Sequence, residues 1–404
     1  MNQFFSNAVK LLSLTVILFA SSCKKDSPDI EESKNYPQSA PTTSTASRLS
    51  DGDFQELADT LEHRLKYKCV GYSFIVSYMG HYKTSRSWGQ SRHLQDLPEQ
   101  PFTMYTKYSI ASVTKTITAT ALIKKLCELP GGINNLDMPV WTYLPAHWQF
   151  GPNFKTITFR QLLAHTSGIR DNNAAFLPGD DYQTLKTLVS KGINLSNKVY
   201  SYNNRNYALM RLLIPKLAQY NIVTINGIMF PGILAILENT QAIQFAEAYK
   251  DYCRQVIFNK LGTTATQTID CVNTDTNPGL CYTFPINYSA GIMCGDLSSI
   301  AGGQGWVLNT VQVNDFFTTL LYTQTLLPYS LSQLMKNQDL GYNGHSTTND
   351  GIGYFWKQGN YDFPTASYRS LIMGFSDDIQ ITMMVNSGIN IVNETMNAHQ
   401  DWHP

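Results

Sequence analysis

The sequence has few charged residues, and the two signs balance. Of 404 residues, 30 are lysine or arginine and 30 are aspartate or glutamate, which gives 15% charged residues and a formal net charge of zero. Globular proteins usually carry about 25%. No block of basic residues follows residue 50. Nucleic acid, which binds strongly basic surfaces, is therefore not an expected partner.

Metal-binding patterns and long apolar runs are also scarce. His399 and His403 are four residues apart, but no glutamate lies between them, so the zinc-protease pattern is absent and no metal site is expected. The apolar run at residues 11–20 is too short to span a bilayer, and no other stretch is long and apolar enough.

The first residues are instead typical of an export signal. Residues 1–22 combine a basic residue, the apolar run and small residues, and Cys23 follows directly. The sequence Ala20-Ser-Ser-Cys23 resembles a bacterial lipobox, although alanine stands where leucine is usual. The alternative is an ordinary cleaved signal with an incidental cysteine. We expect a lipoprotein of the cell envelope, anchored to a membrane through Cys23 and facing the periplasm or the cell surface.

Residues 23–50 should form a tether between this lipidated cysteine and one folded domain at 51–404. They are rich in Pro, Ser, Thr, Lys and Glu and cannot bury a core, so we expect disorder. A flexible chain of this length spans on the order of 30 Å. Among the six later cysteines the pairing stays open, with Cys271 and Cys281 as the favoured pair.

The hydrophobic pattern predicts an α+β fold with strands at both ends of the domain. Residues 51–67 repeat apolar side chains at helical spacing, and residues 390–402 should form a last helix. Strands are predicted at 70–79, 82–88, 368–375 and 379–386. We expect one antiparallel sheet flanked by the terminal helices, with an inserted, mostly helical lobe at roughly 90–350.

Ser112 and Lys115 form the most informative motif. Three residues apart at the start of a predicted helix, they share one helix face, so the amine can reach the hydroxyl. The alternative is a serine N-cap. A lysine is disfavoured there, because the helix N-terminus carries partial positive charge. A locally disfavoured residue points to a functional site.

The segment 158–168 has a structural explanation. Thr158 and Gln161 form a capping box, Gly168 suits a left-handed position after the helix, and His165 falls in the last turn. A triad of His165 with Ser167 is disfavoured, because no G-x-S-x-G elbow precedes it.

Tyr202, Asn203 and Asn204 by themselves indicate a loop with an N-cap asparagine. Beside the Ser112 motif they gain a second interpretation. A phenol can move protons, and an amide can hold both a lysine and a substrate carbonyl.

With these motifs in order, the chain resembles the serine β-lactamase and penicillin-recognising superfamily, especially its class C, D,D-peptidase and esterase branch. The resemblance covers most of residues 51–390. It implies a β-lactamase/transpeptidase-like fold, no cofactor or metal, and an acyl-enzyme formed on Ser112. Lys115 and Tyr202 would move the proton, and Asn204 would orient Lys115 and the substrate. The Ser112 N–H would supply half of an oxyanion hole, and a strand near the third motif the other half.

Two interpretations stay open for the third motif of this resemblance. Lys357 and Gly359 fit a K-x-G pattern that would bind substrate, but Lys357 could equally be an exposed lysine in a hairpin turn. His345 is a weaker candidate, expected in a loop.

The resulting hypothesis is an exported serine hydrolase that cleaves an amide or ester: a D-amino-acid peptide, a β-lactam or a small ester. The main alternative is a binding or regulatory lipoprotein on the same fold with little or no turnover. A third hypothesis is a surface adhesin whose motif matches are accidental.

Overall fold

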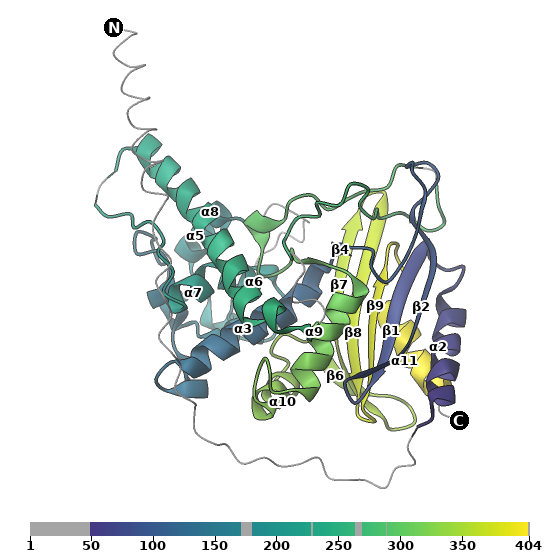
Figure 1. The fold of residues 1–404 in the computed structure, drawn as a ribbon. Coiled ribbons are helices and arrows are strands. Elements are labelled where there is room, and N and C mark those ends of the chain that lie inside the picture. Colours follow the sequence, from purple (N-terminus) through teal and green to yellow (C-terminus); the bar gives the residue numbers. More distant parts are fainter. Residues whose placement is uncertain (1–48, 171–179, 228, 263–268, 288, 403–404) are drawn as a thin grey trace. The chain divides into compact units, whose positions relative to one another are not determined.

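The polypeptide places a sheet with two covering helices beside a helical lobe (Figure 1). The computed structural model describes residues 49–170, 180–227, 229–262, 269–287 and 289–402. The predicted signal, Cys23 and nearly all of the predicted tether lie outside these residues. Residues 49–404 form one compact unit.

The sheet joins the two ends of the domain. Its strand order is β3-β2-β1-β9-β8-β7-β6, and all pairs with assigned register are antiparallel. The central pair is β1 with β9, so the predicted union of N- and C-terminal strands is confirmed. The strands are β1 Gly71–Tyr78, β2 His81–Arg92, β3 Gln100–Pro101, β6 Gly344–Thr347, β7 Gly353–Phe363, β8 Ala366–Phe375 and β9 Ile379–Val385.

Helices α2 (Asp51–Leu65) and α11 (Ile391–Trp402) cover one face of the sheet. Ser50 caps α2 through a capping box with Asp53. Alternate β1 residues, Tyr72 and Phe74 among them, pack under these helices. The residues between them face the lobe, where Ser73 hydrogen-bonds Thr310. β1 is therefore buried on both faces.

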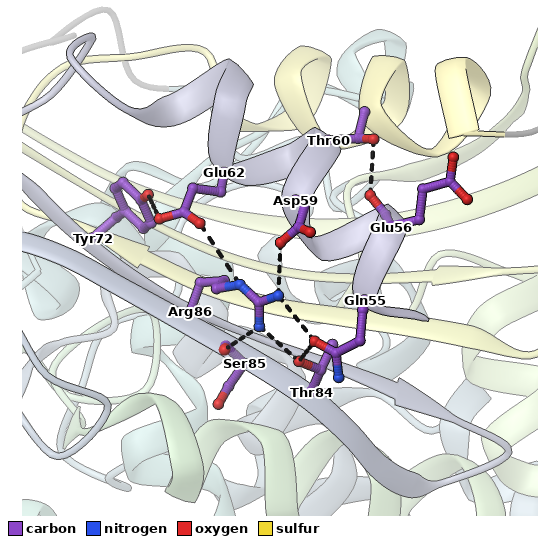
Figure 2. A network of polar contacts seen from close by, with 9 residues as sticks. All are labelled: Gln55, Glu56, Asp59, Thr60, Glu62, Tyr72, Thr84, Ser85 and Arg86. Carbon is purple, nitrogen blue, oxygen red and sulfur yellow. Dashed lines mark hydrogen bonds and ion pairs between the residues drawn. The ribbon is translucent and has the colours of Figure 1, made fainter. Parts of the chain in front are cut away.

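A polar network fastens α2 to the sheet (Figure 2). The Arg86 guanidinium on β2 lies 2.7 Å from Asp59 and 3.6 Å from Glu62 of α2, and it also donates to Gln55. Tyr72 donates to the other Glu62 oxygen at 3.2 Å. These contacts fix α2 on β1 and β2, on the face away from the lobe.

The lobe packs on the opposite face. The helix α9 contacts β1 and β9, and α3 runs through the lobe's apolar core. Strands β4 (Tyr108–Ser109) and β5 (Val307–Leu308) form a separate ribbon. The lobe helices are α3 Thr114–Glu128, α4 Phe159–Leu163, α5 Tyr182–Lys191, α6 Asn204–Ala208, α7 Met210–Leu217, α8 Pro231–Val256, α9 Thr310–Tyr322 and α10 Tyr329–Asn337.

Two expectations were wrong. The favoured pair Cys271 and Cys281 does not form: both thiols are buried and free, and the other described cysteines are free as well. The Cys271 sulfur lies beside Gly305, whereas Cys281 forms an isolated backbone β-bridge with Ile292. His345 lies on edge strand β6 and not in a loop; its side chain is exposed and pairs with Asp339.

None of the described helices is long and apolar enough to cross a bilayer. Within the described ranges, no three His, Cys, Asp or Glu side chains are grouped so as to hold a metal ion.

Candidate active site

Ser112 lies in a tight turn that leads into α3. The turn is a short 3₁₀ helix, Ala111–Val113, and α3 continues it from Thr114. Ala111 has a φ of 44°, a left-handed conformation that costs a non-glycine residue energy and that the surrounding contacts must hold. Ser370 of β8 does so by donating to the Ile110 carbonyl at 2.7 Å. The turn leaves Ser112 partly exposed.

Lys115 is fully buried and directed at Ser112. Its Nζ lies 3.0 Å from Ser112 Oγ, 2.8 Å from Asn204 Oδ1 and 2.6 Å from the Gly303 carbonyl oxygen. The predicted approach of amine to hydroxyl is present. The three acceptors satisfy a cation that would otherwise be costly to bury.

Tyr202 completes a three-residue cluster. Its hydroxyl donates to Ser112 Oγ at 2.7 Å, while 41% of the residue's surface remains exposed. Burial of the hydroxyl raises the pKa of Tyr202. The positive charges of Lys115 and Lys357 and the hydrogen bonds at the hydroxyl outweigh burial and lower the pKa to about 7.

Lys357 belongs to the same cluster. It lies in the middle of β7, fully buried, so the alternative of an exposed hairpin lysine is wrong. Its Nζ lies 4.9 Å from the centre of the Tyr202 ring and has no hydrogen-bond partner among the described residues. Burial lowers the pKa of Lys357 to about 8, helped by the charge of Lys115 and opposed by Tyr202.

Gly359 lets β7 approach the Ser112 turn. A Cβ at this position would lie 2.4 Å from the Ile110 carbonyl oxygen and 2.3 Å from Ser370 Oγ. Gln358 donates its N–H to Asn343 Oδ1, away from β8. Because alternate N–H groups of a strand point the same way, the Asn360 N–H faces this same free edge. Among the β7 residues, Asn360 is therefore the one whose N–H can form an oxyanion hole together with the Ser112 N–H.

His165 has a role that the sequence did not reveal. It adopts a φ of 56°, so His165, and not only Gly168, takes a left-handed conformation after α4. The residue is buried, and burial with the charges of Lys357 and Lys115 holds its pKa well below the usual range. A neutral ring is therefore favoured, although the end of a helix tolerates positive charge.

The neutral His165 ring positions the tyrosine loop. Its Nδ1 accepts the Asn203 N–H at 3.2 Å and lies 3.1 Å from Asn206 Nδ2. Its ring centre is 4.6 Å from that of Tyr202. Asn206 in turn accepts from Ser167 at 2.6 Å, so Ser167 braces this loop and forms no triad with His165.

Gly303 is a site residue that sequence reasoning missed. Its carbonyl accepts from Lys115, and it packs tightly against the Asn204 carbonyl. The neighbouring Gly302 has a φ of 104°. The available signal was the glycine-rich run from Gly302 to Gly305, which marks a close backbone approach without indicating its partner.

The described arrangement can activate an alcohol. Ser112 Oγ touches both an ammonium and a phenol whose pKa is near neutrality, so the phenolate can take its proton at physiological pH. The Ser112 N–H, in a first helical turn without an intrahelical acceptor, can bind developing negative charge. The arrangement is suited to acyl transfer.

Comparisons with known proteins agree with this class. A family profile described as Beta-lactamase matches residues 56–222. The putative penicillin-binding protein PbpX of Bacillus subtilis (strain 168) is 24% identical over 303 residues, which cover 73% of this chain and 64% of that protein. The chain thus spans less than two thirds of the length of the curated relatives it matches.

Two solved structures share the fold. The D-amino acid amidase from Ochrobactrum anthropi SV3, complexed with L-phenylalanine amide, has a TM-score of 0.62 at 17% identity and covers 87% of this chain and 100% of its own. The β-lactamase/D-alanine carboxypeptidase from Yersinia pestis has a TM-score of 0.62 at 14% identity, with coverages of 87% and 97%. The fold and site geometry are those of proteins with a serine nucleophile beside a lysine and a tyrosine. The profile match and the penicillin-binding relative support the serine β-lactamase and penicillin-binding-protein superfamily for this chain.

Replacing Gly359 with alanine should damage the site by steric overlap. The new Cβ must displace either the Ile110 carbonyl or Ser370, which shifts the Ser112 turn. We expect a loss of about 1–3 kcal/mol in the free energy of unfolding, measured in urea. We also expect Ser112 acylation to slow about 100-fold or more. Gly295→Ala, where a Cβ meets open space, is the control. Equal behaviour of the two variants would contradict the close approach.

The pKa of Tyr202 should be measurable by ultraviolet titration of wild-type protein against Tyr202→Phe. One tyrosine should ionise near pH 7, because two ammonium groups favour the phenolate. Lys357→Met removes one of these charges and should move this ionisation to higher pH. Lys336→Met, at a lysine that lies over the Phe355 ring, should leave it unchanged. An ionisation that stays near 10 in the wild-type protein would remove the proposed base.

Proposed function

We propose that this protein is a serine hydrolase that cleaves an amide or ester through an acyl-serine intermediate. One observation carries the proposal: Ser112 Oγ lies 3.0 Å from Lys115 Nζ and 2.7 Å from Tyr202 Oη. The Beta-lactamase profile match and the amidase and carboxypeptidase neighbours support the same reaction class.

In this mechanism the Tyr202 phenolate accepts the Ser112 proton while Ser112 Oγ attacks the substrate carbonyl. The N–H groups of Ser112 and Asn360 stabilise the oxyanion. When the carbonyl re-forms, Tyr202 returns the proton to the leaving amine or alcohol. A water molecule that loses a proton to the same phenolate then attacks the acyl carbonyl, and the neutral Tyr202 passes this proton to the departing Ser112 Oγ. The charge of Lys115, whose Nζ lies 3.0 Å from Ser112 Oγ, favours the phenolate.

The proposed substrates are D-amino-acid peptides, β-lactams or small esters. The Lys357 ammonium group lies beside Tyr202 and has no hydrogen-bond partner among the described residues. It can therefore donate to a carboxylate or carbonyl oxygen of the substrate. The rival hypothesis of a binding protein was motivated by the imperfect third motif and by the wide, neutral surface. The burial of Lys357 beside Tyr202 supports turnover over this rival.

A covalent probe tests the nucleophile. A fluorescent acyl-phosphonate or penicillin should label the wild-type protein, and Ser112→Ala should not be labelled. Lys115→Ala should also lose labelling, with a change in unfolding free energy of about 1–2 kcal/mol, because only a few buried acceptors lose their partner. Ser190→Ala, at an exposed serine of α5, is the serine control and should keep labelling. Labelling that persists in Ser112→Ala would exclude Ser112 as the nucleophile. A folded wild-type protein that neither probe labels would favour the binding protein.

We also propose that the protein is a lipoprotein, cleaved before Cys23 and held at the bacterial envelope. The sequence Ala20-Ser-Ser-Cys23 after an apolar run supports this. Cys23→Ala should move the protein from washed membranes to the soluble fraction, as followed by immunoblotting, whereas Cys127→Ala should not. A wild-type protein whose Cys23 carries no acyl group by mass spectrometry would contradict the lipid anchor.

A further inference from the structure

The first two turns of α8 stand apart from the core. The buried positions of this helix begin only at Glu238. Before it, Phe230 is 80% exposed, Ile233 40% and Ile236 57%. In Figure 1 this end of α8 extends past α5 and α7 of the same lobe. Exposed apolar helical turns are weakly stabilised in water, because tertiary packing supplies most of the stability of helices in proteins.

The apolar character surrounds the helix axis. No charged residue occurs between Lys216 and Glu238. Positions 231–237 are Pro, Gly, Ile, Leu, Ala, Ile and Leu, and at 100° per residue they cover every side of the helix. A helix that docks on a protein surface needs only one apolar stripe. A helix that is apolar on all sides is typical of a core or a membrane, where apolar groups surround it.

Glu238 is the first residue of α8 that is buried in the lobe. Its carboxylate is buried and accepts from Lys186 at 2.5 Å, and it lies 2.9 Å from His147 Nε2. The charge that ends the apolar run is therefore satisfied inside the lobe. We call residues 229–237 the α8 tip.

We propose that the α8 tip inserts into the interfacial region of a lipid bilayer. Its two helical turns are about 10 Å long, which matches the depth of about 5–10 Å that interfacial helices reach. No described helix can span a bilayer, so this contact would be peripheral. Pro231 lacks an N–H, which leaves one donor fewer to satisfy at the inserted end.

A bilayer is favoured over two other occupants, a second copy of the chain and residues 11–20 of this chain. Either protein segment would cover one side of the α8 tip and leave the other exposed. The expected lipid on Cys23 and its tether would also keep the domain beside a membrane surface, where a weak second contact becomes effective. This inference does not depend on the proposed catalytic activity.

The first test measures the depth of Phe230 directly. The full chain would be reconstituted in phosphatidylcholine–phosphatidylglycerol vesicles with or without brominated acyl chains. Phe230→Trp should show quenching beyond that of the six native tryptophans. Tyr67→Trp, at a residue 73% exposed that follows the end of α2, should show none. Quenching in Phe230→Trp no greater than in Tyr67→Trp would overturn the proposal.

The second test measures vesicle partitioning of the full chain carrying Cys23→Ala, at excess lipid. Adding Ile233→Ser and Ile236→Ser should weaken partitioning about tenfold or more. Adding Tyr67→Ser and Tyr82→Ser, which removes other exposed apolar side chains, should not. Thermal unfolding should confirm that both variants fold.

Two results would overturn the proposal in favour of the other occupants. One is concentration-dependent dimerisation of the Cys23→Ala parent that the isoleucine substitutions abolish, without vesicle binding. The other is vesicle binding that the isoleucine substitutions leave unchanged, which would assign the contact to residues 11–20 or to another surface.

Discussion

Two buried ammonium groups facing one phenol ring are the constraint on which the site depends. Lys115 Nζ lies 5.0 Å and Lys357 Nζ 4.9 Å from the centre of the Tyr202 ring. Both charges favour the phenolate and bring its pKa to about 7, although burial acts in the opposite direction. The free-energy cost of burying the two ammonium groups is therefore offset in part when Tyr202 ionises, which is the ionisation that the proposed chemistry needs. A tyrosine can then act near neutrality, which it cannot do in water.

The fold holds these groups from three separate directions. Lys115 comes from α3 in the lobe, Lys357 from β7 of the sheet, and Tyr202 from a loop braced by His165. The sheet can approach the lobe at this point because Gly359 has no side chain. Sheet and lobe thus meet at the Ser112 turn, and both must be in place before the three groups come together.

The α8 tip differs from the rest of the lobe in the exposure of its apolar side chains. Elsewhere the lobe helices bury their apolar side chains in a shared core, whereas the α8 tip presents them to the surroundings. In the proposed envelope setting, a lipid on Cys23 would give attachment and the α8 tip would give orientation. The catalytic cluster and the membrane contact would then be separate features of one domain, with separate physical origins.

The sequence alone determined what is local: the helix pattern at residues 51–67, the capping box at Thr158, the strands at both ends, and the i, i+3 pairing of Ser112 with Lys115. Only the tertiary structure placed Lys357 in a strand, made the His165 ring a neutral support and brought the Gly303 carbonyl to Lys115. The reason is that backbone geometry fixes a short motif within one element, whereas contacts between different segments of the chain depend on how the layers pack. The same packing decided that Cys271 and Cys281 stay apart.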